Sequence, residues 1–270
     1  MTSGLGRALR AERLKLTTTR TWWALGAMLA VYVAVVAVFL TASFAADLAG
    51  ASGPPPDLDA PTTAALLYTL GTPVGYVFPA LLGVLVITTE YRYRTLTPTF
   101  LAQPRRAVVL AAKLTTTTAT GLLYGVAALV LTVPAVAGVL AATGHPSSLA
   151  VASVQAAMAR SVVGHALWAA IGVGLGLVVR SQVAAVVIVV ATSQLVEPLL
   201  RIGLAAWSVT RGVSRYLPGS AADALTGASI YTVSAGASLL APWQGAVVLA
   251  AYALALTGAG AWLTARRDVL

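Results

Sequence analysis

The chain has no cysteine, which excludes disulfides, thiolate metal sites and cysteine nucleophiles. It is also poor in charge, because only 9% of its 270 residues are charged whereas a soluble domain carries about 25%. This scarcity excludes an ordinary cytosolic enzyme. The few charges are unbalanced: 17 Lys and Arg against 8 Asp and Glu give a net charge of +9, which suits nucleic acid, a membrane or a topology signal.

Apolar residues, in contrast, make up 59% of the chain. Apolar stretches of about 20 residues recur, and a helix of that length crosses a hydrocarbon core of roughly 30 Å. We therefore predict an all-α polytopic membrane protein with a single transmembrane domain over residues 1–270 and no soluble domain. The six spans are expected at about residues 22–46, 63–89, 117–142, 161–179, 183–204 and 242–264. The second span holds Gly71, Pro73, Gly75 and Pro79, which predict a kinked helix that faces inward.

The positions of the basic residues predict the orientation. Thirteen of the 17 cluster at one set of span ends, whereas the other side carries Asp47, Asp57, Asp59 and Asp223. The thirteen are Arg7, Arg10, Arg13, Lys15, Arg20, Arg92, Arg94, Arg105, Arg106, Lys113, Arg180, Arg266 and Arg267. The positive-inside rule then predicts a multi-pass protein of the cytoplasmic membrane with both termini in the cytoplasm. The positive charge thus indicates topology, and no nucleic-acid partner is expected.

Residues 3–20 precede the first span and fit an amphipathic helix lying on the inner membrane surface. The apolar face consists of Leu5, Ala8, Leu9 and Leu16, and Glu12 interrupts it. Two interpretations are equally supported by these residues: an anchor held by anionic lipids, or a docking surface for a cytoplasmic partner.

Residues 90–106, EYRYRTLTPTFLAQPRR, are too dense in charge, aromatic residues and proline for a simple turn. They suggest a short helix parallel to the membrane, rigidly joined to the second and third spans. Such a helix could pass a push from a soluble partner into the membrane. From the residues alone, a solvated loop that only sets topology is the favoured interpretation.

A family resemblance changes this balance. The acid, the Thr-Leu pair and the Pro-Arg pair of this segment, with a Lys at the next span, resemble the cytoplasmic signature of type-2 ATP-binding-cassette (ABC) exporter permeases. The residues that stand in this order are Glu90, Thr95, Leu96, Leu101, Pro104, Arg105, Arg106 and Lys113. The run Glu12, Arg13, Lys15 and Arg20 and the terminal Arg266-Arg267-Asp268 are similar to the same family. One departure is Arg94, where many relatives have glycine.

The resemblance implies a transmembrane subunit that pairs with a second permease copy or a homologous permease, above two ATPase subunits. Residues 90–106 would contain the coupling helix. The residues expected to couple to the ATPase are Glu90, Arg92, Arg94, Thr95, Leu96, Leu101, Pro104, Arg105, Arg106, Glu12 and Lys15. The chain itself has no Gly-x-x-x-x-Gly-Lys-Ser/Thr, and its only lysines are Lys15 and Lys113. ATP and Mg would therefore belong to the partners, and this chain is predicted to be no enzyme and to bind no cofactor or metal.

The expected function is export of an amphiphilic or hydrophobic substrate. The alternative is an ATP-independent secondary transporter or a non-transporting membrane scaffold. A secondary transporter is expected to carry buried ionisable residues near the midplane, and Glu197 and Arg201 are the only candidates.

Two features of the predicted outer half remain open between structural and functional interpretations. Glu197 and Arg201 are four residues apart on one helix face, so they are expected to pair, to face a cavity or to lie near the surface. Residues 205–241 suit an interfacial loop, and the family resemblance implies a re-entrant helical pair there. His165 is expected to be a hydrogen-bonded packing residue.

Overall fold

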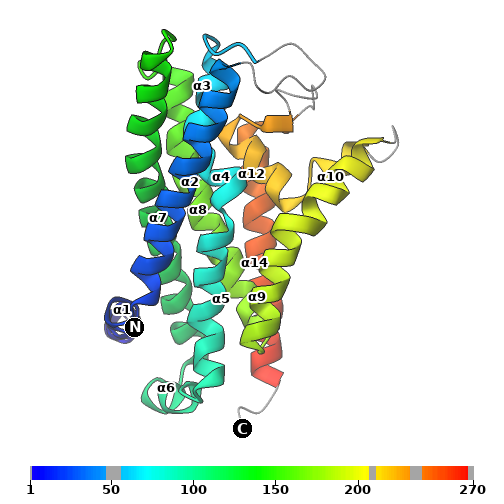
Figure 1. The fold of residues 1–270 in the computed structure, drawn as a ribbon. Coiled ribbons are helices and arrows are strands. Elements are labelled where there is room, and N and C mark those ends of the chain that lie inside the picture. The colour runs from blue at the N-terminus through cyan, green and yellow to red at the C-terminus, as the bar shows by residue number, and fades with distance from the viewer. Residues whose placement is uncertain (1, 47–55, 207–210, 232–238, 267–270) are drawn as a thin grey trace.

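The computed structural model describes residues 2–46, 56–206, 211–231 and 239–266, and these parts of the chain are helical, with no strand among them (Figure 1). Six helical stretches are long and apolar enough to cross a membrane, which confirms the prediction of a multi-pass helical membrane protein. They are Thr21–Ala45, Pro61–Arg92, Arg106–Ala142, Ala152–Val178, Gln182–Leu204 and Pro242–Thr264.

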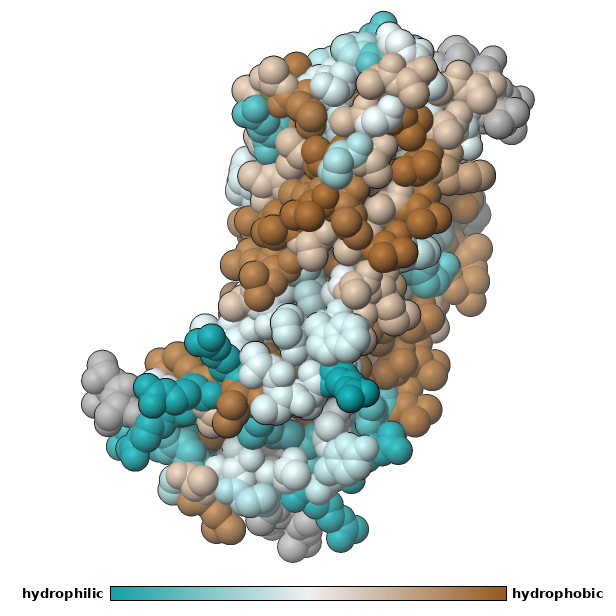
Figure 2. Space-filling view, turned by 60° about the vertical axis from the view of Figure 1, so that its left-hand side comes forward, coloured by the Kyte–Doolittle hydropathy of each residue, from teal (hydrophilic) through white to brown (hydrophobic). Residues whose placement is uncertain are grey.

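The first and last of these stretches are α2 (Thr21–Ala45) and α14 (Pro242–Arg266). Helix α1 (Thr2–Thr18) precedes α2 at an angle to the bundle, and α6 (Leu96–Ala102) lies between the second and third stretches. In Figure 1, α1, α6 and the last turn of α14 lie at one end of the bundle, which we call the basic end. Figure 2 shows hydrophilic side chains gathered at this end, below apolar surface that covers the helices. The opposite end is called the far end.

The second stretch is broken, as its glycine and proline residues predict. It consists of α3 (Pro61–Tyr68), α4 (Gly71–Gly75) and α5 (Val77–Arg92). Proline has no N–H to donate and clashes with the preceding turn, so the chain changes direction at each break. Most of this stretch is buried inside the bundle.

Two glycines let α5 touch α8 (Ala152–Val178). A Cβ on Gly172 of α8 would lie 2.1 Å from the Ala80 carbonyl oxygen, and one on Gly83 of α5 would lie 2.3 Å from the Ala169 carbonyl oxygen. Only residues without a side chain permit such an approach of two backbones. Helix α8 is therefore the centre of the bundle, packed against α5, α14 and α7 (Arg106–Ala142).

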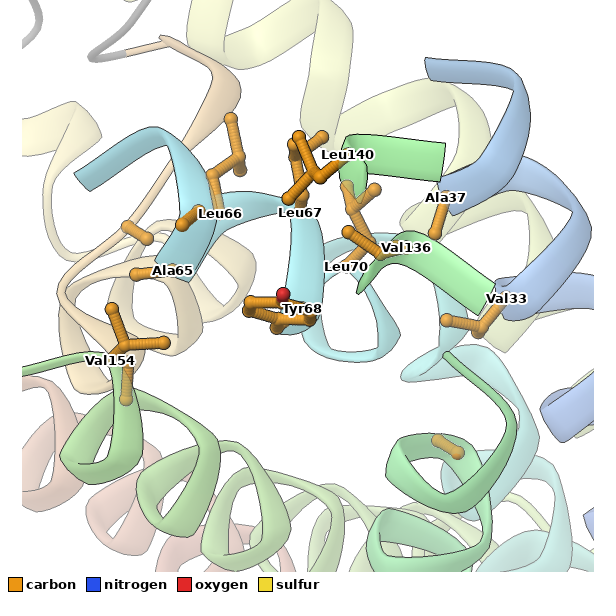
Figure 3. Close-up of a cluster of buried hydrophobic side chains, with 14 of the residues drawn as sticks. Val33, Ala37, Ala65, Leu66, Leu67, Tyr68, Leu70, Val136, Leu140 and Val154 are labelled. Atoms are coloured by element: carbon orange, nitrogen blue, oxygen red, sulfur yellow. The ribbon is translucent and has the colours of Figure 1, made fainter. Parts of the chain in front are cut away.

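An apolar core closes the far end of the bundle around α3 (Figure 3). It contains Leu66, Leu67 and Tyr68 of α3, with Val33 and Ala37 of α2 and Val136 and Leu140 of α7 among its members. The Tyr68 hydroxyl donates a hydrogen bond of 2.8 Å to the Ser147 carbonyl oxygen in the loop that precedes α8. Apolar packing alone therefore joins the first three spans at this end of the bundle.

Two helices begin before the residues at which the third and fourth spans are predicted to start, and each additional segment contains a basic residue. Helix α7 begins at Arg106 instead of Thr117 and includes Lys113, and α8 begins at Ala152 instead of Ser161 and includes Arg160. Both charges have partners: Lys113 binds two glutamates, and Arg160 Nη2 donates to the Thr226 carbonyl oxygen at 3.1 Å. A paired charge does not end a helix.

The fifth stretch is interrupted near its middle. Helix α9 (Gln182–Ala191) runs into one π-helical turn, η1 (Thr192–Val196), which is followed by α10 (Glu197–Ala206). The Tyr76 hydroxyl donates to the Ser193 carbonyl oxygen in this turn at 3.0 Å. Residues 179–181 connect α8 to α9, and α9 packs mainly on α5 and only slightly on α8.

Candidate functional site

The four side chains Glu12, Lys15, Glu90 and Lys113 form a closed ring of ion pairs at the basic end, which we call the Lys–Glu ring. Lys113 Nζ lies 2.6 Å from Glu90 Oε1 and 2.8 Å from Glu12 Oε2. Lys15 Nζ lies 2.8 Å from Glu12 Oε1 and 2.8 Å from Glu90 Oε1. Each lysine thus binds both glutamates, and two positive and two negative groups leave the ring neutral.

The ring is asymmetric in its exposure to solvent. The side chain of Lys113 is 1% exposed, whereas that of Lys15 is 44% exposed. Burial alone would lower the pKa of Lys15, but the hydrogen bonds and charges of Glu12 and Glu90 outweigh it, so the pKa is raised above its normal value of 10.5. Lys15 is therefore protonated at neutral pH, and the ring is fully charged on its exposed side.

The ring joins three helices, α1, α5 and α7. Glu12 and Lys15 come from α1, Glu90 from the last turns of α5, and Lys113 from α7. Helix α6 is attached twice: the Thr95 N–H at its start donates to the Glu90 carbonyl oxygen at 3.0 Å, and Lys15 Nζ donates to Thr99 Oγ1 at 3.4 Å. A displacement of α6 therefore acts on the same residue, Glu90, that closes the ring.

Some of the predicted coupling residues bind side chains or carbonyl groups of other helices, and the others are exposed to solvent. Glu12, Lys15 and Glu90 belong to the ring, and Arg106 Nη1 donates to the Thr264 carbonyl oxygen in the last turns of α14 at 2.8 Å. Arg92 Nη1 donates to Gln182 Oε1 at 3.3 Å, next to the start of α9. The remaining side chains that are described, those of Arg94, Thr95, Leu101, Pro104 and Arg105, are exposed on or beside α6. The Leu96 side chain, Arg267 and Asp268 lie outside the described residues.

Arg94 has a left-handed backbone conformation with φ of 55°. Glycine adopts this conformation readily, whereas a residue with a Cβ does so at a cost. The position at which the chain departs from the resembled permeases is therefore one at which glycine fits the backbone better.

The residue that sequence reasoning missed is Lys113. It was placed at the start of a span, and its role in a buried ring was not predicted. A signal was present, since the chain has only two lysines in 270 residues and a lysine inside an apolar helix usually faces the protein interior and pairs with another group.

A second charged cluster, formed by Glu197, Arg201 and Asp223, joins α10 to α12 (Pro218–Thr226) toward the far end. Arg201 Nη2 lies 3.0 Å from Glu197 Oε1, and Arg201 Nη1 lies 2.8 Å from Asp223 Oδ2. Glu197 Oε1 also accepts the N–H groups of Gly219 at 2.6 Å and Ser220 at 3.1 Å. The carboxylate thus binds the first turn of α12, where the helix dipole favours an anion. The pairing partner Asp223 was not predicted.

Helix α12 belongs to the segment expected to be interfacial or re-entrant. It packs against α14 and α8, inside the bundle, and its residues from Gly219 to Thr226 are buried. Residues 207–210 and 232–238 of the predicted segment lie outside the described residues. His165 is buried in α8, and its Nδ1 lies 2.8 Å from the Ser161 carbonyl oxygen, in agreement with a packing residue.

Both clusters are networks of ion pairs. Among the described residues, no group of three or more His, Cys, Asp or Glu side chains lies close enough together to hold a metal ion. The Lys–Glu ring offers a mechanical connection, because it joins three helices through charges that are costly to separate inside the protein. In comparisons with known proteins, no family model and no curated protein matches this chain.

Proposed function

We propose that this chain is the permease subunit of an ABC transporter. It would export an amphiphilic or hydrophobic substrate across the cytoplasmic membrane, driven by ATP hydrolysis in separate nucleotide-binding subunits that bind ATP and Mg. A second permease copy or a homologous permease would complete the transmembrane part. Both termini would lie in the cytoplasm, and residues 205–241 would contain the re-entrant pair.

The observation that carries the proposal is the attachment of α6 to the Lys–Glu ring. A coupling helix has to present an exposed surface to the ATPase and a firm connection to the spans. Helix α6 meets both requirements: Leu101 is 78% exposed, and the two hydrogen bonds to Glu90 and Lys15 connect it to α5 and α1. The apolar side chain of Leu101 is thus available to a protein contact at the charged end.

The unequal distribution of charge supports the same proposal. The basic end combines exposed Arg94 and Arg105 with the neutral Lys–Glu ring, whose two glutamates are buried, so a protein partner at this end meets mainly positive charge. In this arrangement a push on α6 moves α1, α5 and α7 together. ATP hydrolysis in a partner could therefore change the packing of three helices through one contact.

The proposal is tested by changing α6 and measuring how much ATPase copurifies from native membranes. Leu101→Glu removes the exposed apolar contact without touching the ring, and the expected result is loss of the ATPase. Ala150→Glu, an exposed loop position at the far end, is the matched control and should retain it. If Leu101→Glu and Ala150→Glu recover the same amount of ATPase, α6 is not the docking helix.

A further inference from the structure

A pocket of about 380 Å³ lies beside the Lys–Glu ring, between α1, α2 and α5. Its rim is exposed and consists of Thr19, Thr21, Tyr93 and Thr95 with Lys15, whereas its floor includes the buried residues Leu82, Glu12 and Glu90. Its size is in the range of small-molecule sites. The pocket is therefore a formed concavity with access from outside.

The pocket is polar at one end and apolar at the other. Glu90 and Glu12 lie at the basic end, and the wall formed by Leu82, Leu85 and Val86 lies one to two helical turns further into the membrane-spanning part of α5. An amphiphile that enters from the adjacent membrane leaflet has the same polarity, with its head group toward the basic end.

Two buried polar atoms of pocket residues have no hydrogen-bond partner among the described residues. One is Glu90 Oε2, an acceptor on a residue that is 7% exposed, and the other is Trp22 Nε1, a donor. The other carboxylate oxygen of Glu90 binds both lysines, so Oε2 alone is left buried without a partner. A buried polar atom without a partner is costly, and a ligand that supplies a donor and an acceptor would satisfy both atoms.

From this geometry we infer that the pocket binds one membrane phospholipid with a primary ammonium head group. The ammonium donates to Glu90 Oε2, and a phosphate or ester oxygen accepts from Trp22 Nε1. The head group and the start of one acyl chain fill the pocket along Leu82, Leu85 and Val86, and the rest of the chain lies in the bilayer. This inference needs no ATPase and does not rest on the proposed transport function.

The inference is tested by native mass spectrometry of the delipidated protein, titrated with phosphatidylethanolamine or phosphatidylcholine of identical acyl chains. The two lipids carry the same charges, but the trimethylated ammonium of phosphatidylcholine has no N–H to donate. We expect one saturable phosphatidylethanolamine, bound about tenfold or more tightly than phosphatidylcholine, from one added charged hydrogen bond. Equal binding of the two lipids, or no saturable site, overturns the inference.

Variants identify the pocket as the place of binding. Trp22→Phe keeps an aromatic ring but removes the donor and should weaken the phosphatidylethanolamine site, whereas Trp23→Phe, at a neighbouring residue that is 53% exposed and outside the pocket, should leave it unchanged. Leu85→Trp fills the apolar wall and should abolish the site. A site that survives Leu85→Trp in folded protein lies elsewhere, and the inference is then wrong.

Discussion

The two lysines of the chain allow an internal comparison, because both bind Glu12 and Glu90 and differ mainly in burial. Lys113 is 1% exposed and Lys15 is 44% exposed. Replacing each by methionine makes the same chemical change and leaves the same two carboxylates with one ammonium. The difference between the two variants therefore reports what burial adds to the ion pairs of the ring.

The expected magnitudes differ severalfold. Lys113→Met leaves an uncompensated charge in the interior, a change that typically costs about 3 to 5 kcal/mol of unfolding free energy. Lys15→Met removes two ion pairs whose cation is 44% exposed, so water can take the place of the ammonium, and about 1 kcal/mol or less is expected. Adding Glu90→Gln to Lys113→Met restores a neutral ring, so the double variant should lose less stability than the sum of the two single variants.

The assay is thermal unfolding in detergent followed by tryptophan fluorescence, because the chain has six tryptophans. At roughly 2 to 4 °C per kcal/mol, Lys113→Met should lower the midpoint by about 6 °C or more and Lys15→Met by a few degrees at most. Equal shifts for the two lysines, or an unchanged midpoint for Lys113→Met, would refute the reasoning that the buried side holds the ring.

The raised pKa of Lys15 gives this comparison a pH dependence. A group whose pKa is higher in the folded state contributes its stability fully below its unfolded value, here 10.5, and loses it as the pH rises through the folded pKa. The difference in unfolding free energy between wild type and Lys15→Met should therefore be constant from neutral pH to about 10 and should decrease only above that pH.

Three further substitutions have expected outcomes that the same unfolding assay can check. Arg94→Gly should stabilise the protein by up to about 1 kcal/mol, because φ of 55° is unfavourable for a residue with a Cβ; a destabilised variant would show that the Arg94 side chain matters more than its backbone. Gly172→Ala should cost at least about 1 to 3 kcal/mol by overpacking, whereas Gly138→Ala, whose new carbon meets nothing within 4 Å, should be neutral or slightly stabilising; similar values for both would contradict the close approach of α5 and α8. Arg201→Met should cost about 3 to 5 kcal/mol because it leaves two buried carboxylates, and Glu197→Gln should cost less since Arg201 keeps Asp223; the reverse order would be incompatible with the α10–α12 cluster.

The spans were predictable because length and apolar composition are local properties of the chain. The breaks around Gly71 and Pro73 were predictable for the same reason, since they depend on residues that cannot maintain a regular helix. The starts of α7 and α8 are not predictable in this way, and the partners of their residues Lys113 and Arg160 lie in distant segments of the chain.

The Lys–Glu ring shows the same limit at the candidate site. The sequence indicated that Glu12, Lys15 and Glu90 matter, through a family resemblance, but no spacing relates residue 12 to residue 113. Likewise Glu197 and Arg201 share a helix face by their spacing, whereas Asp223 reaches Arg201 only after α12 packs into the bundle. Pairs within one helix can be predicted from the sequence, whereas the members of each network that come from other helices cannot.

The central claim is that the basic end receives force from an ATPase. The most direct measurement is identification of the proteins that copurify with the wild-type chain from native membranes under gentle extraction. The account predicts a soluble ATPase that carries Gly-x-x-x-x-Gly-Lys-Ser/Thr, recovered in proportion to the chain. Recovery of no ATPase, together with transport that survives depletion of ATP, would contradict it.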